Sequence, residues 1–144
     1  MKKQATNEYL KTQVMTASRE RLLLMLYDGA IRFASQAREK MVEGDLEAMH
    51  NLLVRSQRVI VQLMAALDPS VDELLCRRLC SLYTFTYMRL VKANVERSAK
   101  LIDEAVEVLT SLRETWEEAI GKMKLEEDGQ SSPVQEGNRV SVET

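Results

Sequence analysis

Hydrophobic residues recur every three or four positions over residues 19–43, which is the spacing of one face of an α-helix. The positions on this stripe are Leu22, Leu26, Ala30, Phe33, Ala37 and Met41. Ser18 is placed to cap the helix, because its hydroxyl can accept from the free N–H groups of the first turn, and Gly44 fits a C-terminal stop. Leu23, Leu24 and Met25 widen the apolar stripe, so we expect this helix to contact more than one neighbour.

Three further stretches show the same periodicity, at residues 46–67, 71–93 and 98–121. Their predicted starts are an Asp45 cap, a capping box of Ser70 with Glu73, and a Ser98 cap. The main stripe of the second predicted helix is Met49, Leu52, Leu53, Ile60, Leu63, Met64 and Leu67. That of the third is Leu75, Leu79, Leu82, Phe85 (or Thr86) and Leu90. That of the fourth is Leu101, Ile102, Ala105, Leu109, Leu112, Trp116 and Ile120.

The connections between these stretches are short, and short connections make successive helices antiparallel neighbours. We therefore predict an all-α fold, an antiparallel up-down-up-down four-helix bundle over residues 18–121. Residues 1–17 are polar and mixed, and we interpret them as an N-terminal arm. Residues 122–144 have little apolar content, and their composition predicts a disordered C-terminal tail.

The composition and net charge exclude several classes of function. The 144 residues correspond to one domain, with 45% hydrophobic and 29% charged residues, as in an ordinary soluble globular chain. A net charge of −2 argues against nucleic acid, which needs a basic face, and against an anionic membrane surface. The longest apolar run, residues 59–67, is too short for membrane insertion. Residues 1–8 lack the apolar segment of a signal peptide, so we expect a cytoplasmic protein.

No group of residues in the sequence supports catalysis, a cofactor or a metal. Glu47 and His50 resemble half of a di-iron site in a helical bundle, but His50 is the only histidine and a second such pair cannot exist. Cys76 and Cys80 lie one turn apart, where a disulfide would strain a helix, and we interpret them as small buried side chains in a reducing compartment. We interpret Asp28 and Asp103 as ordinary surface charges. We therefore predict that the protein is not an enzyme.

The second and third predicted helices carry more apolar residues than a bundle core requires. One interpretation is a broad core contact or a dimer seam. The other is an exposed apolar groove that receives a partner helix. The third helix adds these apolar residues outside its main stripe: Leu74, Tyr83, Tyr87, Met88 and Val91.

Several sequence motifs occur in order along most of the chain. The first motif reads Tyr9-x4-Val14-x-Thr16-Ala17-Ser18, then Leu22-x-x-Met25-Leu26-Tyr27-Asp28-Gly29-Ala30. Later motifs are Ser56-Gln57 with Ile60 and Leu63, Ala66-Leu67-Asp68, Leu82-Tyr83, Arg89-Leu90-x-x-Ala93-Asn94, and Leu112-Arg113-x-x-Trp116. Together these motifs resemble the flagellar secretion chaperones of the FliS family, and the resemblance covers about residues 8–120 in the family's order. Arg19 departs from it, since the family usually has Pro at this helix start.

The resemblance implies a cytoplasmic helical bundle that binds the C-terminal segment of newly made flagellin and prevents premature polymerisation before type III export. It also implies contact with a component of the export gate and, in some bacteria, with regulatory proteins. A disordered client segment that folds on binding loses entropy, so the receiving groove must be large.

We choose candidate client-binding residues mainly among the apolar residues that exceed what a bundle core requires. On the second and third helices they are Val54, Val61, Met64, Ala65, Leu74, Tyr83, Tyr87 and Met88. Gln57 is either a buried polar contact or a client-reading residue. Tyr9 and Leu10 of the arm either fold over the empty groove and are displaced by the client, or belong to an arm that is simply disordered.

Two other functions compete with the export chaperone. The first is a homo-oligomeric structural bundle without a flagellin client, in which the apolar excess is buried against another copy; a weak homodimer is also compatible with a chaperone. The second is a small helical enzyme or metal protein, which one bound iron or zinc per chain would reveal.

Overall fold

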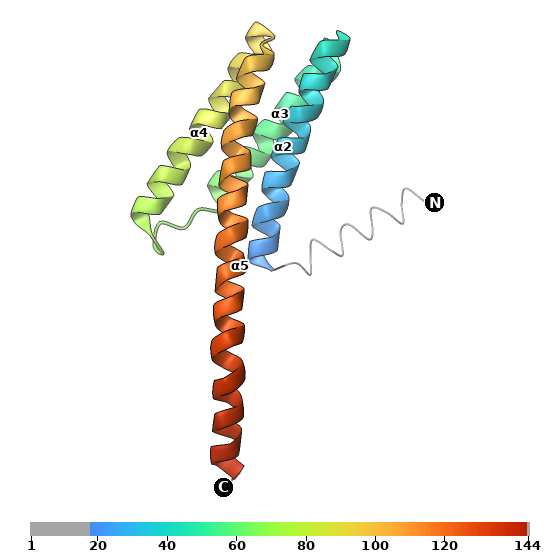
Figure 1. Ribbon diagram of the computed structural model, residues 1–144. Coiled ribbons are helices and arrows are strands. Elements are labelled where there is room, and N and C mark those ends of the chain that lie inside the picture. Colours follow the sequence, from blue (N-terminus) through green and yellow to red (C-terminus); the bar gives the residue numbers. More distant parts are fainter. Residues whose placement is uncertain (1–17, 144) are drawn as a thin grey trace, which may run out of the picture. The chain divides into compact units, whose positions relative to one another are not determined.

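The computed structural model describes residues 18–143. These residues form four α-helices, α2 (Arg19–Glu43), α3 (Leu46–Ala65), α4 (Glu73–Glu96) and α5 (Ala99–Glu143). Successive helices run in opposite directions (Figure 1), and no strand occurs in this range. The predicted all-α antiparallel four-helix architecture is therefore confirmed.

The chain divides into two compact units, residues 1–113 and 114–144. The first contains α2, α3, α4 and α5 as far as Arg113, and the second contains the rest of α5. Helix α5 continues through residues 122–143, where the composition predicted a disordered tail. An ion pair of 3.3 Å between Lys122 and Glu118, one turn apart, supports the helix where that tail was expected to begin. The arm predicted at residues 1–17 lies outside the described residues.

Most helix ends follow the predicted capping residues. The Ser18 hydroxyl accepts from the backbone N–H of Arg21 at 3.2 Å, and Asp45 accepts from Ala48 N–H at 3.1 Å. Ser98 accepts from Leu101 N–H at 3.3 Å. Gly44 ends α2 with φ +81°, a left-handed conformation that glycine adopts without steric cost.

The predicted capping box at the start of α4 is wrong. Asp72 caps this helix and accepts from Leu75 N–H at 3.0 Å. Ser70 instead donates its backbone N–H and its hydroxyl to the carboxylate of Asp68, so it is committed to the turn before the helix. Because α3 ends at Ala65, the connection between α3 and α4 is longer than predicted.

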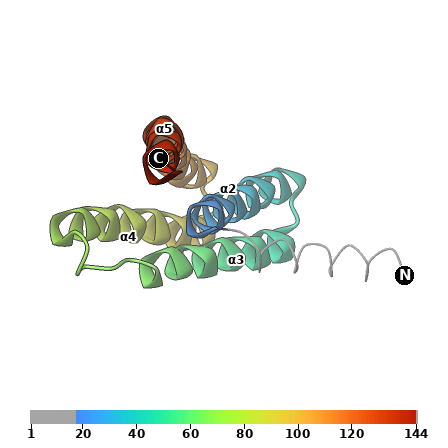
Figure 2. The same ribbon diagram turned by 90° about the horizontal axis from the view of Figure 1, so that it is seen from below.

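Helices α2 and α3 run side by side (Figures 1 and 2). Small residues lie in the seam between them. Ala30, Ala34 and Ala37 of α2 are fully buried. Ser56 of α3 is also fully buried, and its hydroxyl donates to the carbonyl of Ala30 at 2.7 Å. A serine side chain is short, so this bond requires the two backbones to lie close together, and it also satisfies a buried polar group.

Two tyrosines join α2 to α4 in the core. Tyr27 is fully buried and Tyr83 is 1% exposed. Their hydroxyls lie 2.5 Å apart in a hydrogen bond, and their ring centroids are 6.1 Å apart at an interplanar angle of 56°. This tilted arrangement suits the ring quadrupoles. In the shared bond one hydroxyl donates and the other accepts, so each has a hydrogen-bond partner away from water.

Ion pairs join the first part of α5 to α2 and α4. Asp28 and Asp103, which the sequence analysis treated as ordinary surface charges, pair with Arg113 and Arg38 respectively. The Arg38–Asp103 pair is two-pronged, with N–O distances of 2.6 and 3.1 Å. A hydrogen bond to Asp103 raises the pKa of Arg38 above its ordinary value. Glu104 pairs with Arg89 of α4 at 3.3 Å. These contacts hold α5 in register against its neighbours.

Candidate functional site: the apolar face of α4

Helix α4 and the turn before it expose an unusual number of large apolar side chains. Seven of the eleven large hydrophobic residues exposed in the described part of the chain lie between Val71 and Val95. They are Val71, Leu74, Leu75, Leu82, Phe85, Met88 and Val95, and we call them the apolar face of α4. An exposed apolar surface of this kind on one element marks an interaction site.

The apolar face of α4 arises because a different stripe of the helix enters the core. The buried residues are Leu79, Tyr83, Thr86, Leu90 and Ala93, spaced alternately four and three residues apart. The sequence analysis placed Leu75 and Leu82 in the core, and this prediction is wrong, since both are exposed. It left Phe85 and Thr86 as alternatives for one core position, and Thr86 is the buried one. The hydroxyl of Thr86 donates to the carbonyl of Tyr83 at 2.8 Å, which allows this polar residue to be buried.

Two shallow hollows lie along α4 and share Phe85 and Met88. One, of about 410 Å³, is lined by Phe85, Met88, Arg89, Val91, Lys92, Val95 and Glu96. The other, of about 590 Å³, is lined by Arg77, Cys80, Ser81, Thr84, Phe85 and Met88. The guanidinium of Arg89 lies 4.7 Å from the centre of the Phe85 ring and also pairs with Glu104. Phe85 is therefore held in place, and the face offers apolar recesses with charged residues at their edges.

The surface stripe of α3 that lies beside α4 carries several of the predicted client-binding residues. His50 shows which side of α3 faces α4, because its Nδ1 forms a hydrogen bond of 2.7 Å with Nδ2 of Asn94 on α4. Residues spaced four and three apart share a helix face, and these are His50, Val54, Gln57, Val61 and Met64. On α4, the residues that precede Asn94 on the same helix face include Val91, Tyr87 and Cys80. We call these two stripes the α3–α4 seam.

The predicted client-binding residues have different positions in the structure. Leu74 and Met88 lie on the apolar face of α4 and are 55% and 54% exposed. Val61 and Ala65 are exposed on α3. Val54, Gln57, Met64 and Tyr87 are half-buried along the α3–α4 seam. Tyr83 belongs to the core, and Tyr9 and Leu10 lie outside the described residues.

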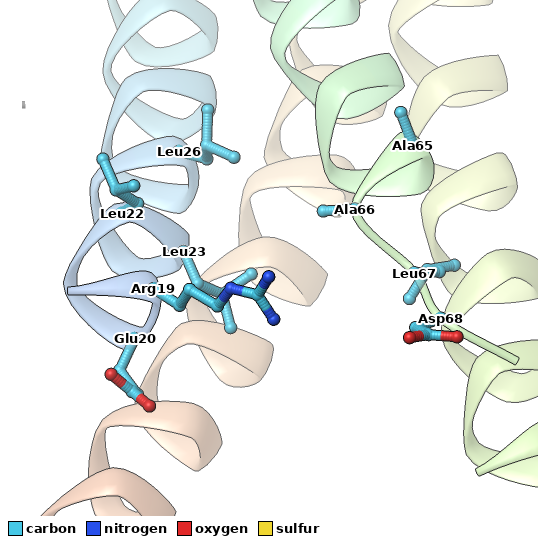
Figure 3. A pocket seen from close by; sticks show the side chains of 9 residues that line it. All are labelled: Arg19, Glu20, Leu22, Leu23, Leu26, Ala65, Ala66, Leu67 and Asp68. Carbon is cyan, nitrogen blue, oxygen red and sulfur yellow. The ribbon is translucent and has the colours of Figure 1, made fainter. Parts of the chain in front are cut away.

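A third hollow, of about 690 Å³, lies between the start of α2 and the end of α3 (Figure 3). Its apolar lining consists of Leu22, Leu23, Leu26, Ala65, Ala66 and Leu67, and Arg19, Glu20 and Asp68 complete it. The wide apolar stripe at the start of α2 was the sequence signal for this hollow, since it indicated contacts on more than one side. Hydrogen bonds from Ser70, together with the charge of Arg19, hold the pKa of Asp68 below its ordinary value of 3.8.

The cysteines and the histidine do not form a chemical site in the described residues. Cys80 is exposed and Cys76 is half-buried, so the prediction that both are buried is wrong. The reason is that both lie beside the buried stripe of α4 rather than on it. Among the side chains that the structure describes, no group of three or more His, Cys, Asp or Glu residues is arranged to hold a metal ion. No helix in the described part of the chain is long and apolar enough to cross a membrane.

Comparison with known proteins identifies the family. The family model of the flagellar protein FliS matches residues 1–123. The chain belongs to the FliS family. The flagellar secretion chaperone FliS of Bacillus subtilis is 28% identical over 121 residues, which cover 84% of this chain and 90% of the relative. That of Salmonella typhimurium is 30% identical over 119 residues, 82% of this chain and 88% of the relative.

A solved structure supports the FliS fold. The crystal structure of a bacterial flagellar chaperone superposes with a TM-score of 0.69 at 24% identity, and the match covers 85% of this chain and 99% of the other. The helical architecture is therefore shared. The family resemblance predicted from the sequence motifs is confirmed, and the chain is a flagellar secretion chaperone by family.

Proposed function

We propose that the chain binds the disordered C-terminal segment of flagellin in the cytoplasm, on the apolar face of α4 and the α3–α4 seam. Binding covers the apolar helix faces through which flagellin subunits assemble, so it prevents premature polymerisation and keeps the client ready for type III export. Contacts with a component of the export gate and with a flagellar regulatory protein belong to the same proposal. This function needs an apolar surface and no catalytic residue.

The observation that carries the proposal is the gathering of seven exposed apolar residues on and just before α4. An amphipathic helix binds by placing its apolar face in an apolar groove, with anchors three or four residues apart. Leu74 and Met88 are half-exposed, so each has apolar area left to bury, and Phe85 is held between the two hollows of α4. The family's name supports a flagellar client, and the motif resemblance points to flagellin.

Calorimetric titration with the C-terminal ~40 to 60 residues of flagellin from the same organism tests the proposal, with circular dichroism alongside. We expect one-to-one binding, a large negative heat-capacity change and a gain of helix, because apolar area is buried while the segment folds. The double variant Leu74→Ser/Met88→Ser is expected to weaken binding by at least about tenfold, since it removes two apolar anchors.

Val42→Ser is the matched control, because Val42 is 75% exposed but lies at the end of α2. It should change the affinity by less than about twofold. Absence of binding at tens of micromolar, or equal weakening by the control, would contradict the proposal.

A second copy of the chain is the alternative occupant of the same face. In that homo-oligomeric bundle the apolar face of α4 is buried permanently, and the flagellin segment has no effect. Sedimentation velocity distinguishes the two, because a tight dimer that ignores the flagellin segment supports the structural bundle. A monomer, or a weak homodimer that the flagellin segment dissociates, supports the chaperone.

A further inference from the structure

Two arginines from different helices converge on one aromatic ring, away from α4. The guanidinium carbon of Arg32 on α2 lies 5.1 Å from the centre of the Phe33 ring, and that of Arg55 on α3 lies 4.3 Å from it. Arg58 follows Arg55 by three residues on α3 and shares its face. All three arginines are exposed, while Phe33 is half-buried. We call these four residues the arginine cluster.

The arginine cluster differs from the arginines that join the helices. Arg38, Arg89 and Arg113 each pair with a carboxylate of a neighbouring helix. Among the residues whose side chains the structure describes, no carboxylate pairs with a guanidinium of the arginine cluster. Gathering like charges is unfavourable, and here stacking on the Phe33 ring holds two of them in place. The arrangement therefore presents positioned cations whose hydrogen-bond donors point to no acidic group of the described chain.

We propose that the arginine cluster is a docking site for an acidic segment of a partner protein. A guanidinium presents a planar set of donors that matches a carboxylate in a two-pronged pair, and a stacked guanidinium loses less freedom when it binds. Cations positioned in advance on one surface therefore select a chain that carries several carboxylates. The complementarity is one of charge, in contrast to the apolar complementarity of the α4 face.

Two other occupants fit the cluster less well. A nucleic acid needs a longer basic track, and this chain has a net charge of −2 with only three arginines in the cluster. A small anion is held best in an enclosed site, whereas the arginines of the cluster are exposed. An acidic peptide spreads its carboxylates over an open surface, which matches the exposure of the cluster.

The site lies on the α2–α3 hairpin, so it does not depend on what binds the apolar face of α4. A client on the apolar face of α4 and the α3–α4 seam meets apolar side chains, whereas an acidic partner at the arginine cluster meets charged ones. Both sites include residues of α3, but these are different residues. The inference therefore stands whether or not flagellin is the client.

Fluorescence anisotropy with a labelled 16-residue peptide of alternating glutamate and alanine tests the site. The same peptide with glutamine in place of glutamate is the uncharged probe. The Arg55→Gln/Arg58→Gln variant is expected to weaken binding of the glutamate peptide by about fivefold at low salt, because two exposed charge pairs are lost. The binding should also weaken as salt is raised, since exposed charges are screened.

The matched control is Arg21→Gln/Arg78→Gln, which removes the same charge from two exposed arginines outside the cluster. This control should change the affinity by less than about twofold, and circular dichroism verifies that both variants fold. Three outcomes would overturn the proposal: no binding of the glutamate peptide, equal weakening by the control, or equal binding of the glutamine peptide. Tighter binding of a single-stranded oligonucleotide than of the glutamate peptide would also overturn it, in favour of a nucleic-acid site.

Discussion

The α2–α3 hairpin and helix α4 differ in how the rest of the chain covers their apolar residues. The hairpin packs through fully buried small residues, and Ser56 reaches the backbone of the neighbouring helix. Helix α4 buries one stripe and leaves a wide apolar face exposed. The difference shows that apolar content alone does not mark the core. The hairpin is a tightly packed scaffold, and α4 is the element that leaves large apolar side chains exposed.

The largest expected effect is a loss of stability caused by overpacking the α2–α3 hairpin. Ala34→Leu adds three heavy atoms to a fully buried position of α2, the helix that packs against α3. Overpacking of this kind costs about 1–3 kcal/mol or more of the free energy of unfolding. Urea denaturation followed by circular dichroism measures the loss.

The control for this change is Ala119→Leu, the same substitution at an exposed position of α5. It should alter the free energy of unfolding by less than about 0.5 kcal/mol. If Ala34→Leu were as mild as this control, the α2–α3 seam would not be tightly packed and the contrast with α4 would lose its basis.

A smaller effect is expected where the scaffold meets α4, at the tyrosine pair. Tyr27→Phe and Tyr83→Phe should each cost about 1–2 kcal/mol, because one buried hydroxyl loses a partner. The double variant should cost less than the sum, with a coupling of about 0.5–1 kcal/mol. Tyr87→Phe is the control, since Tyr87 is half-buried and water can reach it. Strict additivity of the two changes would mean that the hydroxyls do not stabilise each other.

The local parts of the fold could be predicted from the sequence. The predicted range of the first helix coincides with α2, and the Ser18, Asp45 and Ser98 caps are confirmed. These features depend on residues within a few positions of one another, so one stretch of sequence contains the whole cause. The start of α4 shows the limit, because Ser70 and Asp72 both fit the capping pattern. The choice between them depends on the turn formed by Asp68.

The buried face of α4 could be predicted only in part, because part of its cause lies far away in the sequence. Leu79 and Leu90 were predicted correctly, and Thr86 was one of two alternatives. Leu82 is more apolar than Tyr83, so a hydrophobicity argument places Leu82 in the core. Tyr83 is nevertheless the buried residue, since its hydroxyl meets that of Tyr27, 56 positions earlier. The same uncertainty affects the candidate site, because the sequence analysis identified Leu74 and Met88 but left Phe85 as an alternative core residue.

The smallest expected effect concerns the connection between the two regions, where Asp68 holds the turn that leads from α3 to α4. The Ser70 hydroxyl donates to its carboxylate at 2.5 Å and the Ser70 backbone N–H at 3.0 Å. These bonds favour the ionised form, so the pKa of Asp68 is lowered in the folded state. A carboxyl group with a lowered pKa in the folded state stabilises the fold at pH values above its pKa in the unfolded chain. This stabilisation is lost as the pH falls through the pKa of the folded state.

The stabilising effect of Asp68 is therefore complete near neutral pH and disappears below its ordinary pKa of 3.8. Asp68→Asn should make the urea midpoint less dependent on pH between about pH 5 and pH 2.5. Ser70→Ala should move the Asp68 pKa upward, because the hydroxyl bond is the largest cause of the shift. Carboxyl NMR titration measures that pKa in each protein. If Asp68 titrates at its ordinary pKa in the native chain, the hydrogen bonds of this turn do not restrain the connection. Helix α4 would then not be held to the α2–α3 hairpin through this turn.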